Sequence, residues 1–136
     1  MILIIVIYNS KYMNTHHRDT ILISLRPDIT IDIERVSLPE EKFQQQTLRP
    51  ILTFQNAVIM EYFIAKTASS NIPIDVHERS LFVENTIRKD LVLRNQLIGL
   101  VAGLFTSEEF AFYLQHASTL NKRITQLLIK RLQDQF

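Results

Sequence analysis

Residues 51–65 read ILTFQNAVIMEYFIA, and their apolar side chains recur at the three- and four-residue spacings of an α-helix. Two apolar stripes run along this segment and extend toward the N-terminus: Phe43, Thr47, Ile51, Phe54, Val58 and Tyr62 form one, and Leu48, Leu52, Ile59 and Phe63 form the other. Apolar surface therefore covers most of the helix circumference, which is typical of a helix at the centre of a fold.

Local signals mark the start, the interior and the end of this helix. Residues 38–41 (LPEE) open it, because proline suits the first helical position and acidic side chains suit the positive end of the helix dipole. Pro50 lacks the amide that would donate to residue 46, so we expect a kink there or a restart with Pro50 in the first turn. Residues 66–71 (KTASSN) end the helix.

The next helix is predicted to begin after Pro73, where Asp75 and Glu78 have the spacing of a capping box. We expect a break near Asp90. The following residues 97–105 (LIGLVAGLF) are wholly apolar and continue the helical region.

Two helices are predicted to complete the chain. Thr106 and Glu109 again have capping-box spacing, which places a helix start at Ser107. Ser118 or Thr119 is expected to cap the last helix. Its apolar stripe comprises Leu120, Ile124, Leu127, Leu128 and Leu132.

The N-terminal region differs from the rest of the chain. Residues 1–8 (MILIIVIY) are nearly all apolar, but a transmembrane helix needs about 20 such residues. We interpret residues 1–12 as a strand or as an upstream extension, with the working start near Met13. Asp19 is expected to cap a short helix that stops at Pro27, and the alternation in residues 29–33 predicts a strand or an extended arm.

Composition favours one helical domain. The 136 residues suit a single domain, and only two glycines and four prolines occur, which is few for a β-sandwich or barrel. We therefore predict an all-α fold of about five helices in a compact bundle over residues 13–136, with a short β or extended segment before it. The absence of cysteine excludes disulfides and thiolate chemistry and suits a reducing, cytoplasmic location.

The two glycines, Gly99 and Gly103, lie four residues apart and would share one helix face. An interior glycine costs about 1 kcal/mol relative to alanine, so the pair indicates a packing role. One hypothesis is the close approach of a second copy of this helix, with Leu104 and Phe105 completing a homodimer contact. The alternative divides the pair: Gly103 caps the helix, Leu104 or Phe105 makes the accompanying apolar contact, and Gly99 relieves crowding in the monomer.

The last helix is basic, and Asp134 is its only acidic residue. Its cations are Lys122, Arg123, Lys130 and Arg131. One hypothesis is that they contact nucleic acid, to which the net charge of +1 for the whole chain gives no support. The alternative is a solvated basic face, with Lys130 and Arg131 near the negative end of the helix dipole.

Residues 106–132 also resemble a helix-turn-helix. Ala111 matches the small residue of its first helix. Gln115 or His116 stands where the turn usually has glycine, and Asn121 stands where an apolar residue is expected. The resemblance therefore rests on one position of three.

Glu61 lies inside the apolar run VIMEYFIA. If this carboxylate were buried, its pKa would be raised, and Gln55 and Asn56 could line a small-molecule pocket with it. The alternative is that Glu61 marks the exposed edge of the helix.

No catalytic residue, metal ligand or cofactor is predicted. The four histidines include no pair at the i, i+4 spacing of a helical zinc site; they are His16, His17, His77 and His116. No phosphate-binding loop, dinucleotide-binding turn, nucleophile elbow or HExxH motif occurs. These absences remove the enzyme classes that such motifs identify; they do not exclude an enzyme, although we expect a non-enzymatic protein.

Residues 43–52 (FQQQTLRPIL) and 120–133 (LNKRITQLLIKRLQ) resemble a family of small uncharacterised helical bacterial proteins, some of which carry an automated glyoxalase label. The resemblance covers the chain from about Leu38 onward and implies a helical fold. Well-known glyoxalases place metal ligands on a βαβββ scaffold, and neither that strand order nor the ligand pairs occur here. The resemblance therefore maps no active-site residue.

Three functions remain open from the sequence. The first is a non-enzymatic protein-interaction module that forms a homodimer through residues 97–105 or the last helix. The second is a regulator that binds nucleic acid through the basic C-terminal helix. The third is a small-molecule pocket around Glu61. None of them involves a membrane.

Overall fold

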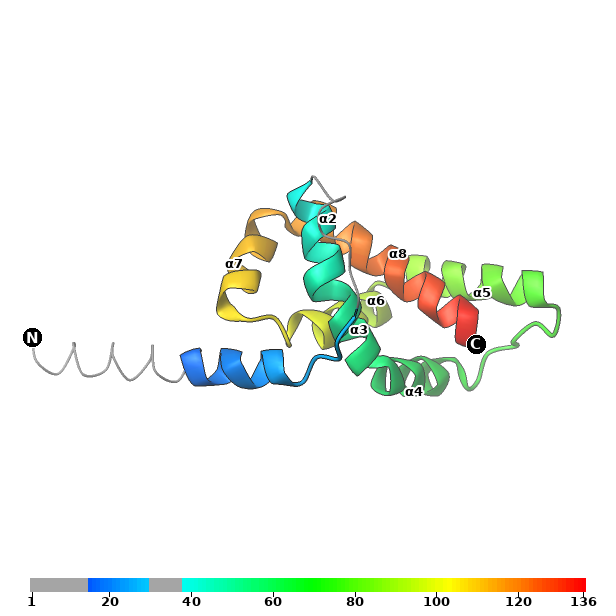
Figure 1. Cartoon of the computed structure of the whole chain (residues 1–136). Coiled ribbons are helices and arrows are strands. Elements are labelled where there is room, and N and C mark those ends of the chain that lie inside the picture. The colour runs from blue at the N-terminus through cyan, green and yellow to red at the C-terminus, as the bar shows by residue number, and fades with distance from the viewer. Residues whose placement is uncertain (1–14, 30–37) are drawn as a thin grey trace, which may run out of the picture.

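The computed structural model describes residues 15–29 and 38–136, and every regular element in these ranges is helical (Figure 1). The predicted all-α class is therefore confirmed. Residues 1–12 and the strand predicted for residues 29–33 lie outside the described ranges, except for Ile29, which belongs to no regular element.

Residues 15–24 form a helix, and the labelled elements follow from residue 39 onward. They are α2 (Pro39–Phe43), the π-helix η2 (Gln44–Leu48), α3 (Arg49–Phe54), α4 (Asn56–Thr67), α5 (Val76–Lys89), α6 (Leu91–Ala102), α7 (Ser107–Gln115) and α8 (Ala117–Gln135). The predicted number of about five helices is wrong, because the described chain from residue 39 has seven α-helices. The helix predicted from Leu38 to Ala65 accounts for much of the difference, since it is divided into three α-helices and η2.

Pro50 explains the first interruption of that helix. Without an amide hydrogen it cannot donate to residue 46, and the hydrogen-bond register widens immediately before it. The amide of Arg49 donates to the carbonyl of Gln44, five residues back. The chain then resumes as α3 with Pro50 in its first turn, which confirms the predicted restart.

Gln55 explains the second interruption. Its backbone leaves the helical region at φ −87° and ψ 1°, and α4 begins at the next residue. The Gln55 side chain donates to the carbonyl of Leu100 at 2.9 Å, so this bend is tied to α6. The orientation of α3 is therefore set at both of its ends.

The core is formed mainly by the later helices. α8 alone buries Leu120, Ile124, Thr125, Leu128, Ile129 and Leu132. The segment 51–65, which was predicted to be central, instead has an open side: Phe54, Val58 and Ile64 are 44, 46 and 50% exposed. α3 and α4 bury only one face against the body, which corrects the prediction made from their all-round apolar surface.

Caps define two of the later helix starts, those of α5 and α7, as predicted. The carboxylate of Asp75 accepts the amide of Glu78, and Thr106 and Glu109 form a complete capping box. The cap predicted at Ser118 or Thr119 is wrong, because α8 already begins at Ala117 with no side-chain cap. His116 alone separates α7 from α8, and no room remains for a capping turn.

The helix of residues 15–24 is tethered to α7 by polar contacts. Arg26 donates to Glu109 at 2.8 Å, and Thr47 of η2 donates to the same oxygen at 2.6 Å. Asp19 does not cap its own helix as predicted, because that helix has already begun by residue 15. Its carboxylate accepts instead the amide and the hydroxyl of Ser107, at the start of α7.

Glu109 is the centre of this network. Burial alone would raise the pKa of Glu109, but hydrogen bonds from Arg26, Thr47 and the Thr106 amide outweigh it and hold that pKa below 4.5. The Arg26 and Glu109 side chains are only 10 and 17% exposed. The ion pair therefore joins α7 to the segment just after the helix of residues 15–24, and the Thr47 hydrogen bond adds η2, in a region that solvent screens poorly.

We expect Glu109→Gln to lower the free energy of unfolding by about 3 kcal/mol, because it leaves a buried arginine without its counter-charge. The matched control is Glu84→Gln, since the ion pair of Glu84 with Arg88 is half exposed and should contribute about 0.5 kcal/mol or less. Urea unfolding followed by circular dichroism at pH 7 measures both values. Equal losses in the two variants would contradict this role of Glu109.

The contribution of Glu109 to the free energy of unfolding depends on pH, and the sign of this dependence follows from its lowered pKa. Because the folded-state pKa of Glu109 is lowered, its contribution is fully present above the ordinary value of 4.5 and is lost as the pH falls through the folded-state pKa. The stability difference between the wild type and Glu109→Gln should therefore be constant from pH 7 to pH 5. It should narrow in a further measurement near pH 3.

Candidate anion-binding groove

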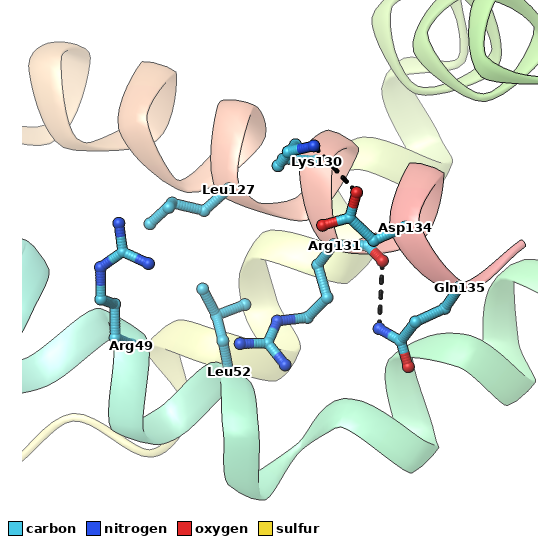
Figure 2. A pocket seen from close by; sticks show the side chains of 7 residues that line it. All are labelled: Arg49, Leu52, Leu127, Lys130, Arg131, Asp134 and Gln135. Carbon is cyan, nitrogen blue, oxygen red and sulfur yellow. Dashed lines mark hydrogen bonds and ion pairs between the residues drawn. The ribbon is translucent and has the colours of Figure 1, made fainter. Parts of the chain in front are cut away.

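A groove of about 290 Å³ lies between α3 and the C-terminal half of α8 (Figure 2). It is lined by Arg49, Leu52, Leu127, Lys130, Arg131, Asp134 and Gln135. Three of these seven side chains are cationic and one is anionic, so the groove has a local excess of positive charge.

The helical repeat places these side chains together. On α3, Arg49 and Leu52 are three residues apart, and on α8, Leu127 and Arg131 are four apart, so each pair shares one face of its helix. Leu52 is buried and Leu127 is half-buried. Figure 2 shows the guanidinium groups of Arg49 and Arg131 on either side of Leu52.

Arg131 is held in place by neutral groups. Its two terminal nitrogens donate to the side-chain oxygens of Asn56 at 3.3 Å and Thr53 at 3.4 Å. Asn56 is itself fixed by reciprocal hydrogen bonds with Gln135 of 2.7 and 2.8 Å. This network orients the guanidinium but adds no negative charge to balance it.

Arg49 and Lys130 complete the charge distribution. Arg49 is exposed and makes no hydrogen bond or ion pair with any residue in the described ranges. Lys130 is already paired with Asp134 at 2.9 Å on the outer side of α8. Among the described residues that line the groove, the only carboxylate is therefore engaged with the lysine and is bonded to neither arginine.

The electrostatics of the groove favour an anion. Burial lowers the pKa of Arg131, repulsion from Arg49 lowers it further, and Asp134 acts in the opposite direction. Two like charges held together raise the energy of the empty groove, and a bound anion would relieve this repulsion. The planar guanidinium group, moreover, matches the paired oxygens of phosphate or carboxylate.

The four predicted basic residues do not form one cluster. Lys130 and Arg131 line the groove, whereas Arg123 donates to Gln44 of η2 at 3.0 Å. Lys122 is exposed and lines a different cleft, between α8 and the helices α5 and α6. Sequence reasoning missed Arg49 altogether, because its proximity to Arg131 depends on how α3 packs against α8.

The helix-turn-helix geometry is absent. That motif joins its helices by a turn of three or four residues, whereas His116 alone separates α7 from α8. Asn121 accepts a hydrogen bond from the Tyr113 hydroxyl at 2.6 Å, which explains why a polar residue stands at that position.

The three residues of the predicted pocket point to different places. Gln55 contacts α6, Asn56 supports the groove, and Glu61 is exposed on α4. A buried Glu61 with a shared pocket is therefore not observed. Asn56 alone takes part in the site, as a residue that positions Arg131.

The glycine pair lies at the end of α6. Gly99 is exposed, and a Cβ atom added there would meet nothing within 4 Å, so it relieves no crowding. Gly103 is the C-cap of α6, as one of the alternatives predicted, but it has an ordinary helical φ of −62°. Leu104 is half-buried and Phe105 is 1% exposed, so Phe105 belongs to the monomer core.

The histidines are dispersed. His16, His17 and His77 are exposed, while His116 stacks on Phe112 with the ring centroids 4.2 Å apart. The described residues contain no group of three or more histidine, aspartate or glutamate side chains placed to hold a metal ion. None of the helices in the described part of the chain is both long and apolar enough to cross a membrane.

No protein-family model matches the chain, and neither the curated proteins nor the solved structures include a significant match. The resemblance to small bacterial proteins therefore stays a prediction.

The open surroundings of Gly99 generate a prediction about stability and assembly. We expect Gly99→Ala to raise the free energy of unfolding by about 1 kcal/mol, because alanine is the better helix former and its Cβ meets no neighbour. Gly103→Ala is the control: its Cβ would lie 3.0 Å from the Gly99 carbonyl, so no gain is expected. Urea unfolding and light scattering measure the two variants. A lower stability of Gly99→Ala together with a smaller solution mass would instead support a homodimer contact at this glycine.

Proposed function

We propose that the chain is a non-enzymatic binding module that holds a phosphate-bearing ligand in the groove between α3 and α8. The observation that carries this proposal is that Arg49 and Arg131 line the same groove, while no carboxylate of the described residues is bonded to either of them. Phosphate supplies the missing counter-charge and several acceptor oxygens.

Charge and size favour a phosphate group over a carboxylate. The lining residues carry three positive charges and one negative charge, an excess that suits a group of −1.5 to −2 better than one of −1. The volume of about 290 Å³ lies at the lower end of small-molecule sites, which suits one phosphate group better than a large cofactor.

The chemistry of the lining side chains supports binding without catalysis. The seven lining residues include no histidine, serine, threonine, tyrosine or cysteine. Asp134, the one residue that could act as a base, is engaged with Lys130. The groove can therefore orient and hold an anion, but its lining offers no free nucleophile.

The homodimer through residues 97–105 stays a prediction. Within that segment Leu97, Ile98, Val101 and Phe105 are buried in the monomer. A contact there would have to use the residues that are not buried, namely Gly99, Leu100, Ala102, Gly103 and Leu104. The phosphate-binding groove needs no second copy and is better supported by the observed charges.

The test is a titration with inorganic phosphate at constant ionic strength, followed by amide chemical shifts. We expect shifts around Arg49 and Arg131, and an affinity at least tenfold weaker in Arg49→Gln, because hydrogen bonds between charged groups contribute about 1.5–3 kcal/mol. Arg49 is exposed, so this variant should fold normally. Lys66→Gln on α4 removes the same charge outside the groove and should bind like the wild type.

Acetate in place of phosphate separates the two anion classes. We expect acetate to bind more weakly, since it carries one charge. Equal affinities for acetate and phosphate would contradict a phosphate site. If Lys66→Gln and Arg49→Gln weaken phosphate binding equally, phosphate is attracted non-specifically and the proposed site is wrong.

A further inference from the structure

A second basic cleft lies on the other side of α8. It has a volume of about 440 Å³ and is bounded by α5, α6 and α8. Its lining residues are Arg88, Arg94, Asn95, Ile98, Asn121, Lys122, Thr125 and Gln126. Three of them are cationic and none is a carboxylate, so this cleft also has an excess of positive charge.

Two of these cations have no acidic partner in the described part of the chain. Arg94 donates to the backbone carbonyl of Arg88 at 3.2 Å, which orients its guanidinium without neutralising it. Lys122 is exposed and contacts no acceptor among the described residues. Arg88 is paired with Glu84 through its Nε atom at 3.0 Å, and that glutamate lies outside the lining of the cleft.

The two basic sites are connected along one exposed row of α8. Lys122, Gln126 and Lys130 are each four residues apart and all three are exposed, so they form a continuous ridge. Lys122 and Gln126 line the second cleft, and Lys130 lines the first groove. At a rise of 1.5 Å per residue, Lys122 and Lys130 are about 12 Å apart along the helix axis.

We propose that the groove, the ridge and the second cleft together bind the phosphate backbone of one nucleic-acid duplex. This inference rests on the proposed phosphate site in the groove and extends it across α8. A single phosphate group can occupy only one of the two sites, whereas a polymer with regularly spaced phosphates can occupy both. The separation of about 12 Å between Lys122 and Lys130 along α8 corresponds to three or four phosphates of one duplex strand, because these phosphates follow each other every 3.4 Å along the duplex axis.

The side chains of the two sites favour a duplex over a single strand. Neither set of lining residues contains an aromatic side chain, and single-strand binding normally depends on bases stacked on aromatic rings. Arginine and lysine contacts to phosphate position a duplex without reading its bases. The surface should therefore bind with little dependence on base sequence and with a steep dependence on salt.

The salt dependence of duplex binding follows from the number of cations that have no carboxylate partner. Four cations in the two sites have no carboxylate partner among the described residues, namely Arg49, Arg131, Arg94 and Lys122. At about 0.9 per neutralised phosphate, their contacts predict a slope near −3.6 for log affinity against log salt with duplex DNA. Removing one of them should bring the slope to about −2.7.

The experiment is fluorescence anisotropy of the full chain with a labelled 20-base-pair duplex over a series of salt concentrations. Arg49→Gln tests the groove, Lys122→Gln tests the second cleft, and Lys66→Gln is the control with the same loss of charge. In each of the first two variants we expect the slope to change from about −3.6 to about −2.7, whereas the control should keep the slope of the wild type. Two duplexes of different sequence should bind equally, and a single strand of the same length should bind more weakly.

The outcomes separate this inference from the proposal for the groove alone. If inorganic phosphate binds at Arg49 while Lys122→Gln leaves duplex binding unchanged, the extended surface is wrong and the phosphate site stands. Tighter binding of the single strand would also overturn it. If neither phosphate nor duplex binds, both proposals fail together.

Discussion

Burial of one face of α8 is the constraint on which the rest of the structure depends. Leu120, Ile124, Leu128 and Leu132 recur every four residues and are fully buried, and α5, α6 and α7 pack against this helix. Once this face is buried, the charged side chains of α8 must lie on its outer side or at its margins. The same apolar stripe that builds the core therefore decides where the cations can meet their neighbours on other helices.

The second constraint is that Pro50 has no amide hydrogen. It widens the register of the preceding turn and starts α3 as a short separate helix, which Gln55 then ends by its hydrogen bond to α6. Between these two breaks, α3 carries Arg49 and Leu52 into position beside α8. A proline that interrupts the helix thus places one arginine of the groove.

Local signals predicted much of the fold, and tertiary contacts account for the rest. The capping box of Thr106 and the cap at Asp75 depend on residues three apart, so the sequence alone reveals them. Asp19 accepts a hydrogen bond from the amide of Ser107, 88 residues later, and no local pattern can indicate that contact. For the same reason Lys130 and Arg131 were recognised as basic residues on one helix, but their grouping with Arg49 required the packing of α3 on α8. The exposed position of Glu61 was one of two alternatives that helix periodicity had left open.

The small net charge of the chain conceals a separation of charge in space. Glu40, Glu41, Glu108 and Glu109 lie on α2 and α7, and none of them lines either basic site. At physiological ionic strength, exposed charges separated by more than about 8 Å are largely screened from each other. An anion at α8 would therefore respond mainly to the cations beside it, and the net charge of +1 is a poor guide to the local field of this surface.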